Sequence, residues 1–167
     1  MKTFKPVMLA VAAAVALGAS PVRAQEVVLK LHHFLPPQAT IQALVFNPWC
    51  EKIGKESGGR IKCQIYPAMQ LGGTPPQLFD QAKDGVADII WTVPTYQAGR
   101  FIKSEVFELP FMAKNAEIGS PALWDYVQKN SLDEFKGVKL LAMHLHDGSL
   151  LHFSGKPVKT LEDLKGV

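Results

Sequence analysis

Hydrophobic and polar residues follow two different periods in the first half of the chain. Alternation with a period of two, or a short apolar run, predicts strands, and wider spacing of apolar residues predicts helices between them. The predicted strands are residues 27–34, 61–66 and 88–93, and the predicted helices are residues 39–55 and 75–84. The order strand, helix, strand, helix, strand predicts an α/β fold with a doubly wound parallel sheet.

The first predicted helix contains a proline and ends at a pair of glycines. Pro48 predicts a kink, because proline has no N–H to donate within a helix, and Gly58-Gly59 suits a left-handed C-terminal cap. The residues predicted to form its apolar face are Ile41, Leu44, Val45, Trp49 and Ile53.

The second predicted helix follows closely on the second strand. Pro67 ends that strand, Gly72-Gly73 allows a tight turn, and Thr74 is placed to cap a helix whose first residue is Pro75. Leu78 and Ala82 are predicted to face inward. A helix N-terminus just beyond the end of a strand is a common place for α/β folds to bind anionic ligands.

The second half of the chain has a weaker pattern. Residues 116–128 predict a helix with Leu123, Trp124 and Val127 on one face, and residues 139–145 predict a strand that 149–153 would accompany. Thr160 is a predicted N-cap, with an acid three residues later.

Residues 1–24 have the organisation of a secretory signal peptide. Lys2 and Lys5 precede an apolar run too short to span a bilayer, and small residues flank Arg23 before the expected cleavage site. Removing this segment removes three of the 18 basic residues and no acid, so the mature chain, with 15 acids, is formally neutral. We therefore expect an exported protein that neither binds nucleic acid nor inserts into a membrane after cleavage.

The two cysteines lie in the exported part of the chain. Cys50 is near the end of the first predicted helix and Cys63 is in the strand that follows, so the returning chain can bring them together. Because disulfides persist outside the cytoplasm, we favour a Cys50–Cys63 bond, with two buried free thiols as the alternative.

Five stretches in order resemble the substrate-binding proteins of tripartite ATP-independent periplasmic (TRAP) transporters, of the DctP type. They are His32-His33-Phe34 with Pro36-Pro37, Glu56 to Ile61 with Tyr66 to Gly73, Asp84-Gly85 with Asp88, Glu108 to Phe111, and Thr160 to Val167. The resemblance covers nearly all of the mature chain.

The resemblance implies a two-lobe periplasmic-binding-protein-like fold in which only the first lobe is largely present. The expected divisions are a signal peptide (1–24), an incomplete first α/β lobe (25–145), and a crossover with the start of a truncated second lobe (146–167). It implies a periplasmic protein that captures a small organic acid and passes it to the membrane permease subunits, with uptake driven by an ion gradient. It implies no catalysis and no cofactor.

The resemblance also places the basic residues expected to bind a carboxylate. The family's main arginine would follow Val167, and a second basic position falls near Leu150, which is apolar here. A monocarboxylate is therefore a better expectation than a multiply charged acid.

Ligand contacts are expected from loops at the carboxyl ends of the strands. The nominated residues are His33, Phe34, Thr74, Trp91, Thr92, Tyr96 and Phe111. Aromatic and histidine side chains would suit a polyol acid or an oxo acid, because they supply a stacking face and a few fixed donors. The alternative is core packing for Trp91 and Phe111, and a satisfied imidazole for His33.

The histidines carry a competing hypothesis. His144 and His146 would share one face of a strand, and together with His32, His33 or His152 they could hold zinc. The protein would then be a secreted metal binder or a metal-dependent hydrolase. No His-Glu-x-x-His helix, nucleophile elbow or phosphate loop accompanies them, so we favour no metal site.

Overall fold

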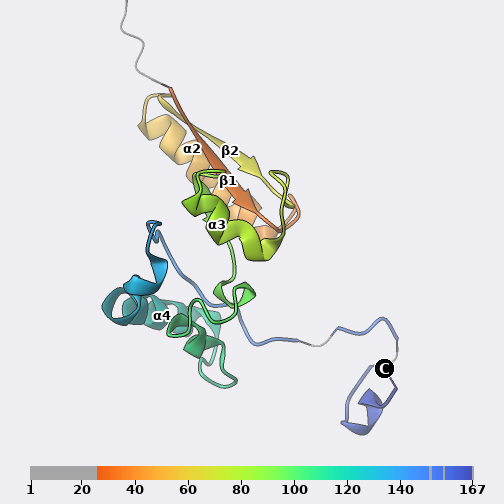
Figure 1. The fold of residues 1–167 in the computed structure, drawn as a ribbon. Coiled ribbons are helices and arrows are strands. Elements are labelled where there is room, and N and C mark those ends of the chain that lie inside the picture. Colours follow the sequence, from red (N-terminus) through yellow and green to blue (C-terminus); the bar gives the residue numbers. More distant parts are fainter. Residues whose placement is uncertain (1–25, 151, 156, 167) are drawn as a thin grey trace, which may run out of the picture. The chain divides into compact units, whose positions relative to one another are not determined.

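The structure is a computed structural model that describes residues 26–150, 152–155 and 157–166 (Figure 1). The predicted signal peptide lies outside the described residues. The chain forms two compact units, which divide between Thr92 and Val93. No helix among the described residues is long and apolar enough to cross a membrane.

The first unit is built on a parallel three-stranded sheet (Figure 1). Its strands are β1 (Val27–His33), β2 (Ile61–Tyr66) and β3 (Ile89–Trp91), in the order β2-β1-β3. Leu31 at the centre pairs with Ile65 of β2 and with Ile89 of β3. The predicted alternation of strands and helices is confirmed, although β3 is shorter than the predicted strand.

The helix between β1 and β2 contains a π-helical turn where the sequence predicts a kink. Its π segment, η1 (Gln42–Phe46), runs directly into α2 (Asn47–Glu56), and the N–H of Asn47 donates to the carbonyl of Gln42. Pro48 lies at the start of α2 and has no N–H to continue regular pairing. The helix ends at Glu56 with Ser57 as its C-cap, and Gly58 and Gly59 adopt positive φ values, as predicted.

The prediction of which residues form the apolar face of this helix is wrong in part. Leu44 and Val45 are 71% and 52% exposed, whereas Phe46 is buried. A π turn contains more residues than an α turn, so it shifts the side that faces the sheet. Ile41, Trp49 and Ile53 remain half-buried, as the pattern predicts.

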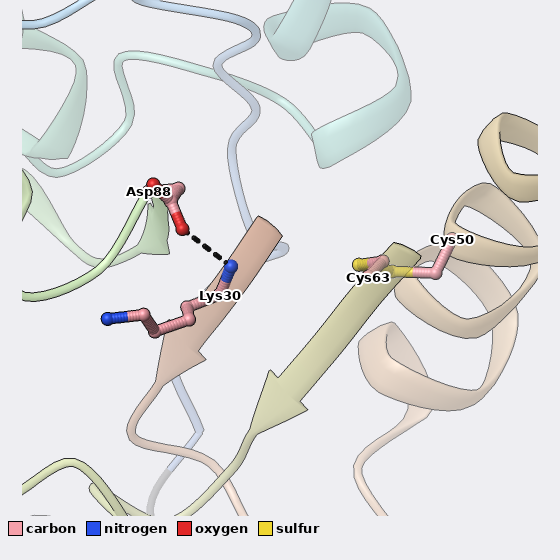
Figure 2. The surroundings of a disulfide bond; sticks show 4 residues. All are labelled: Lys30, Cys50, Cys63 and Asp88. Atoms are coloured by element: carbon pink, nitrogen blue, oxygen red, sulfur yellow. Dashed lines mark hydrogen bonds between the residues drawn. A yellow bond between two sulfur atoms is a disulfide. The ribbon is translucent and has the colours of Figure 1, made fainter. Parts of the chain in front are cut away.

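A disulfide joins this helix to the sheet, which confirms the predicted pairing. Cys50 of α2 and Cys63 of β2 have Cα atoms 5.3 Å apart, and both side chains reach across the gap between the two elements (Figure 2). On the other side of the sheet centre, the backbone N–H of Lys30 donates to Asp88 Oδ2 at 2.8 Å (Figure 2). The disulfide thus joins β2 to α2, and the bond to Asp88 joins β1 to the residue that precedes β3.

The second predicted helix begins with a one-turn 3-10 segment, η2 (Pro75–Gln77), and continues as α3 (Leu78–Lys83). Thr74 caps it as predicted, and the Gln77 side chain accepts from the Thr74 backbone N–H at 2.8 Å. Leu78 is fully buried and Ala82 is half-buried, in line with the predicted inward face.

The second unit is mainly helical. Its elements are η3 (Pro94–Tyr96), η4 (Ser104–Glu108), α4 (Ala116–Asn130), η5 (Leu132–Phe135) and η6 (Glu162–Leu164). Leu123 and Val127 are buried on α4, as predicted, and Trp124 is half-buried. Phe101 stacks on Phe135 with ring centroids 5.0 Å apart.

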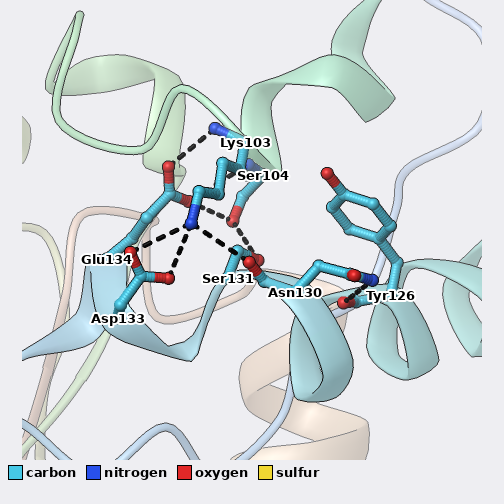
Figure 3. Close-up of polar contacts among 7 residues, drawn as sticks. All are labelled: Lys103, Ser104, Tyr126, Asn130, Ser131, Asp133 and Glu134. Atoms are coloured by element: carbon cyan, nitrogen blue, oxygen red, sulfur yellow. Dashed lines mark hydrogen bonds and ion pairs between the residues drawn. The ribbon is translucent and has the colours of Figure 1, made fainter.

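A polar cluster ties the start of η4 to η5 and to the last residue of α4 (Figure 3). Glu134 accepts from the N–H groups of Lys103 and Ser104 and from the Ser104 hydroxyl. Lys103 Nζ donates to both carboxylate oxygens of Asp133 and to the carbonyl of Asn130. The N–H groups of Lys103 and Ser104 at the start of η4 are thereby satisfied by a carboxylate rather than by water.

The strand predicted over residues 139–145 is wrong. These residues form no ladder, and the described residues of 149–153 form none either; residue 151 lies outside the description. The segment packs on α4 instead: the Leu145 N–H donates to Ser120 Oγ at 2.9 Å, and the Leu145 side chain lies over Gly119. Alternation alone makes no strand, because a strand needs a partner for its backbone groups. Thr160 and Asp163 exchange the predicted pair of hydrogen bonds, at 2.9 Å and 3.4 Å, but the short η6 has Leu161 as its N-cap, one residue later than predicted.

Candidate functional site

The strand order of the first unit identifies one position for a binding site. From β1 the chain moves to one side of the sheet to form β2, and then crosses to the other side to form β3. β1 and β3 are therefore the neighbouring strands at which the strand order reverses, and ligands of open α/β sheets bind at the carboxyl ends of such a strand pair. His33 ends β1 and pairs with Trp91, which ends β3.

Four rings gather at these two strand ends. Phe34 stacks on Trp91 with centroids 5.2 Å apart and an angle of 25° between planes. Phe46 lies 5.3 Å from the His33 ring and 6.4 Å from Trp91, the latter edge-on. We call Phe34, Trp91, Phe46 and His33 the aromatic cluster. His33 and Phe46 are buried, whereas Phe34 and Trp91 are half-buried flat apolar rings of the kind against which another aromatic ring packs.

Three members of the aromatic cluster were nominated from the sequence, and Phe46 was not. A regular helical period places Leu44 and Val45 inward and leaves Phe46 outside the apolar face. The signal that could have identified it is Pro48, because a proline two residues later breaks that period.

His33 is fully buried and has one satisfied ring nitrogen. Its Nε2 lies 3.0 Å from Gln42 Oε1, and its Nδ1 has no hydrogen-bond partner. Burial lowers the pKa of His33, and this outweighs the opposing effect of the bond to Gln42; the neighbouring His32 lowers it slightly further. The imidazole is therefore neutral at physiological pH.

His32 points to the opposite face of the sheet and has both ring nitrogens engaged. Nδ1 lies 2.9 Å from Gln81 Oε1 of α3, and Nε2 accepts from the Leu71 N–H at 3.4 Å. The Gln81 amide in turn donates to the carbonyl of Gly72. Burial also lowers the pKa of His32. His32 thus holds the turn before η2 in place.

Thr74 and Thr92 differ in what their hydroxyl groups do. The Thr74 hydroxyl lies 3.1 Å from Gln77 Oε1 within the capping box, so it is engaged at the helix start. Thr92 follows β3, and its Oγ1 is buried without a hydrogen-bond partner. Of the two, Thr92 retains the unused polar group.

Tyr96 and Phe111 belong to the second unit and are described apart from the aromatic cluster. Tyr96 ends η3 and is 43% exposed. Phe111 is fully exposed, and its φ of 66° is in the left-handed region. A bulky residue adopts that conformation at a cost of roughly 1–3 kcal/mol. The exposure of the Phe111 side chain means that it is displayed rather than packed.

The histidines of the second unit do not assemble a metal centre within the part of the chain that the structure describes, where no group of three potential ligands occurs. His146 Nδ1 donates to the carbonyl of Asp147, and Nε2 lies 3.4 Å from Glu108 Oε2. The bond to Asp147, with a smaller contribution from Glu108, raises the pKa of His146. These contacts do not favour the metal hypothesis.

Comparison with known proteins decides between the two classes. Residues 31–167 match the family DctP, described as bacterial extracellular solute-binding protein, family 7. The chain belongs to this family. Its members are binding proteins of transport systems and not enzymes.

Solved structures of TRAP solute-binding proteins resemble the chain closely. A TRAP solute-binding protein from Rhodoferax ferrireducens T118, in complex with copurified benzoate, is 55% identical with a TM-score of 0.78; the match covers 84% of this chain and 44% of that one. A marine-metagenome TRAP protein specific for aromatic acid ligands, with 3-hydroxybenzoate, is 50% identical with a TM-score of 0.79, covering 85% and 44%.

A third relative is more distant. The TRAP protein from Bordetella bronchiseptica with bound (R)- and (S)-mandelate is 34% identical with a TM-score of 0.70, over 82% of this chain and 44% of that one. The chain therefore spans less than half the length of the solved relatives that it matches. Its α/β fold matches one lobe of these TRAP solute-binding proteins.

Proposed function

We propose that this chain supplies first-lobe contacts of a periplasmic solute-binding protein that captures a small aromatic carboxylate. The protein would deliver that acid to the permease subunits of a TRAP transporter, for uptake driven by an ion gradient. The observation that carries the proposal is the aromatic cluster at the carboxyl ends of β1 and β3.

The geometry of the aromatic cluster supports a flat apolar ligand. Phe34 and Trp91 are nearly parallel, and Phe46 meets Trp91 edge-on. Such surfaces attract another ring by stacking and edge contacts, which add about 0.5–1.5 kcal/mol per ring pair to the area that is buried. Relatives that are 55% and 50% identical to the chain hold benzoate and 3-hydroxybenzoate, respectively.

The polar groups near the aromatic cluster are few and uncharged. His33 is kept neutral by burial, and Thr92 offers a hydroxyl. A sugar acid would require many more hydrogen-bond partners, since each unpaired buried hydroxyl costs about 1–3 kcal/mol. The charge partner of the carboxylate would come from the second lobe, where the family resemblance places an arginine.

Calorimetry on the full-length protein that carries this sequence tests the proposal. We expect benzoate, 3-hydroxybenzoate and mandelate to bind, and D-erythronate, which has no ring, to bind at least tenfold more weakly. Trp91→Leu should weaken binding of the aromatic acids tenfold or more. Trp49→Leu is the matched control, because Trp49 is half-buried on α2 outside the aromatic cluster.

Two results would contradict the proposal. One is binding of D-erythronate as tight as that of the aromatic acids. The other is a Trp91→Leu variant that stays folded by circular dichroism and binds benzoate as the parent does. Uptake into vesicles that contain the permease tests delivery: it should require the binding protein and an ion gradient, and should not respond to ATP.

A further inference from the structure

Two buried polar atoms without partners lie just where β1 and β3 end. Within the described residues, the buried side-chain atoms that lack a hydrogen bond are His33 Nδ1, Thr92 Oγ1 and Glu105 Oε1. His33 is the last residue of β1, and Thr92 directly follows β3. An unsatisfied buried polar atom costs about 1–3 kcal/mol, so each one requires an explanation.

The contact between His33 and Gln42 determines which chemistry the free nitrogen has. Gln42 presents its carbonyl oxygen, Oε1, to Nε2 at 3.0 Å, and a carbonyl oxygen only accepts hydrogen bonds. Nε2 therefore carries the proton in the neutral ring, and Nδ1 is left with a lone pair. Because Gln42 opens the π segment, the same helix that places Phe46 in the aromatic cluster also sets this tautomer.

An acceptor in this position matches a particular kind of ligand. A ring packed against Phe34 and Trp91 lies beside His33, because Trp91 pairs with His33 across the two strands. A carboxylate oxygen has no hydrogen to give to Nδ1, and neither has the ring of benzoate. A hydroxyl substituent does have one.

We propose that His33 Nδ1 accepts a hydrogen bond from a hydroxyl group of the ligand, so that the protein selects hydroxylated aromatic acids over unsubstituted ones. This inference rests on the proposed function, since it takes the aromatic cluster to be the ligand site. Nδ1 is closed to solvent in this structure, so the ligand reaches it by displacing the side chains that cover it. Gln42 is a positioning residue, because it acts through the tautomer of His33.

The test compares benzoate with 3-hydroxybenzoate by calorimetry on the full-length protein that carries this sequence. We expect 3-hydroxybenzoate to bind about tenfold more tightly, which corresponds to about 1.4 kcal/mol and to one well-made hydrogen bond. His33→Gln removes the acceptor at the Nδ1 position and should abolish the preference. His33→Asn retains a short-reach acceptor and should keep part of it.

His32→Gln is the control for loss of a buried histidine. Both ring nitrogens of His32 are already engaged, so this variant should leave the ratio of the two affinities unchanged. If His33→Gln binds both acids with the parent's ratio, or if the parent does not prefer 3-hydroxybenzoate, the inference is wrong. If the parent binds neither acid, the proposed function fails, which is a separate outcome.

A measurement on the unmodified protein covers the case in which a variant does not fold. Nitrogen-15 NMR of the histidine side chains should show an unprotonated Nδ1 at His33 in the free protein. Adding 3-hydroxybenzoate should shift that resonance toward the hydrogen-bonded value, and benzoate should not. A protonated Nδ1, or equal responses to the two acids, would overturn the inference.

Discussion

Replacing Gly119 with alanine tests how the extended segment before Asp147 packs on α4. A Cβ added at Gly119 would lie 2.5 Å from Leu145 Cδ1 and 2.9 Å from the Cβ of Ala113. Carbon atoms in good contact are about 3.5–4.0 Å apart, so the leucine methyl would have to move by about 1 Å or more. Leu145 is buried and its N–H bonds to Ser120, which leaves it little room to move.

Two opposing effects set the size of the change. Alanine in place of glycine in a helix interior stabilises by roughly 0.5–1 kcal/mol. Forcing extra volume into a packed contact costs typically about 1–3 kcal/mol. We therefore expect Gly119→Ala to lower the free energy of unfolding by about 1–2 kcal/mol.

The matched control is Gly54→Ala in α2. A Cβ there would meet only the carbonyl oxygen of Ile61, at 3.6 Å, which is an ordinary contact. The same chemical change should therefore stabilise by roughly 0.5–1 kcal/mol. Urea unfolding followed by circular dichroism on the full-length protein measures both variants, and the two changes should have opposite signs.

Combining Gly119→Ala with Leu145→Ala tests whether the two side chains clash. Leu145→Ala alone should cost about 2–5 kcal/mol, but in its presence the alanine at position 119 has space. Gly119→Ala should then be neutral or stabilising, with a coupling energy of about 1–3 kcal/mol between the two sites. If Gly119→Ala stabilises the parent as Gly54→Ala does, Leu145 does not pack on α4 as described.

Four further predictions concern other parts of the chain. Denatured, unreduced protein should show no free thiol, and reducing the Cys50–Cys63 bond should cost roughly 3 kcal/mol on chain-entropy grounds; two titratable thiols would contradict this. Because burial lowers the pKa of His32 and His33, the unfolded chain binds protons that the native state does not; their contribution to stability is complete above pH ~6.5 and decreases below it by up to ~1.4 kcal/mol per pH unit and residue. The difference in unfolding free energy between pH 7.5 and 5.5 should therefore shrink in the double glutamine variant, and an unchanged difference would argue against neutral burial. Thr74→Ala should destabilise by about 1 kcal/mol and Thr74→Ser by much less in thermal unfolding, whereas equal losses would show that the hydroxyl is not the cap. The 167-residue chain alone should not bind benzoate measurably by calorimetry, since losing a buried charge partner costs about 2–5 kcal/mol; micromolar binding by this chain would refute the two-lobe account.

Local features of the fold follow from the sequence because short-range chemistry determines them. Strand alternation at 61–66, the stop at Gly58-Gly59 and the cap at Thr74 each depend on a few neighbouring residues. The Cys50–Cys63 bond needs only a helix that returns along a strand, and the sequence indicates that arrangement. The family motifs were equally visible, since they are stretches of sequence.

Tertiary structure decided the features that depend on partners distant in the chain. The strand predicted at 139–145 is extended without a ladder, because its backbone meets α4 rather than another strand. Phe46 entered the aromatic cluster because a π turn changed the helical period, and no periodic pattern contains that change.

The two adjacent histidines show the difference most clearly. In the sequence, His32 and His33 are two residues of the same type at neighbouring positions of one predicted strand. Successive side chains of a strand point to opposite faces, so His32 meets Gln81 and the Leu71 N–H, whereas His33 meets Gln42. One imidazole is satisfied on both sides and the other keeps an unused acceptor, because which helix covers which face of the sheet is decided only when the chain has folded.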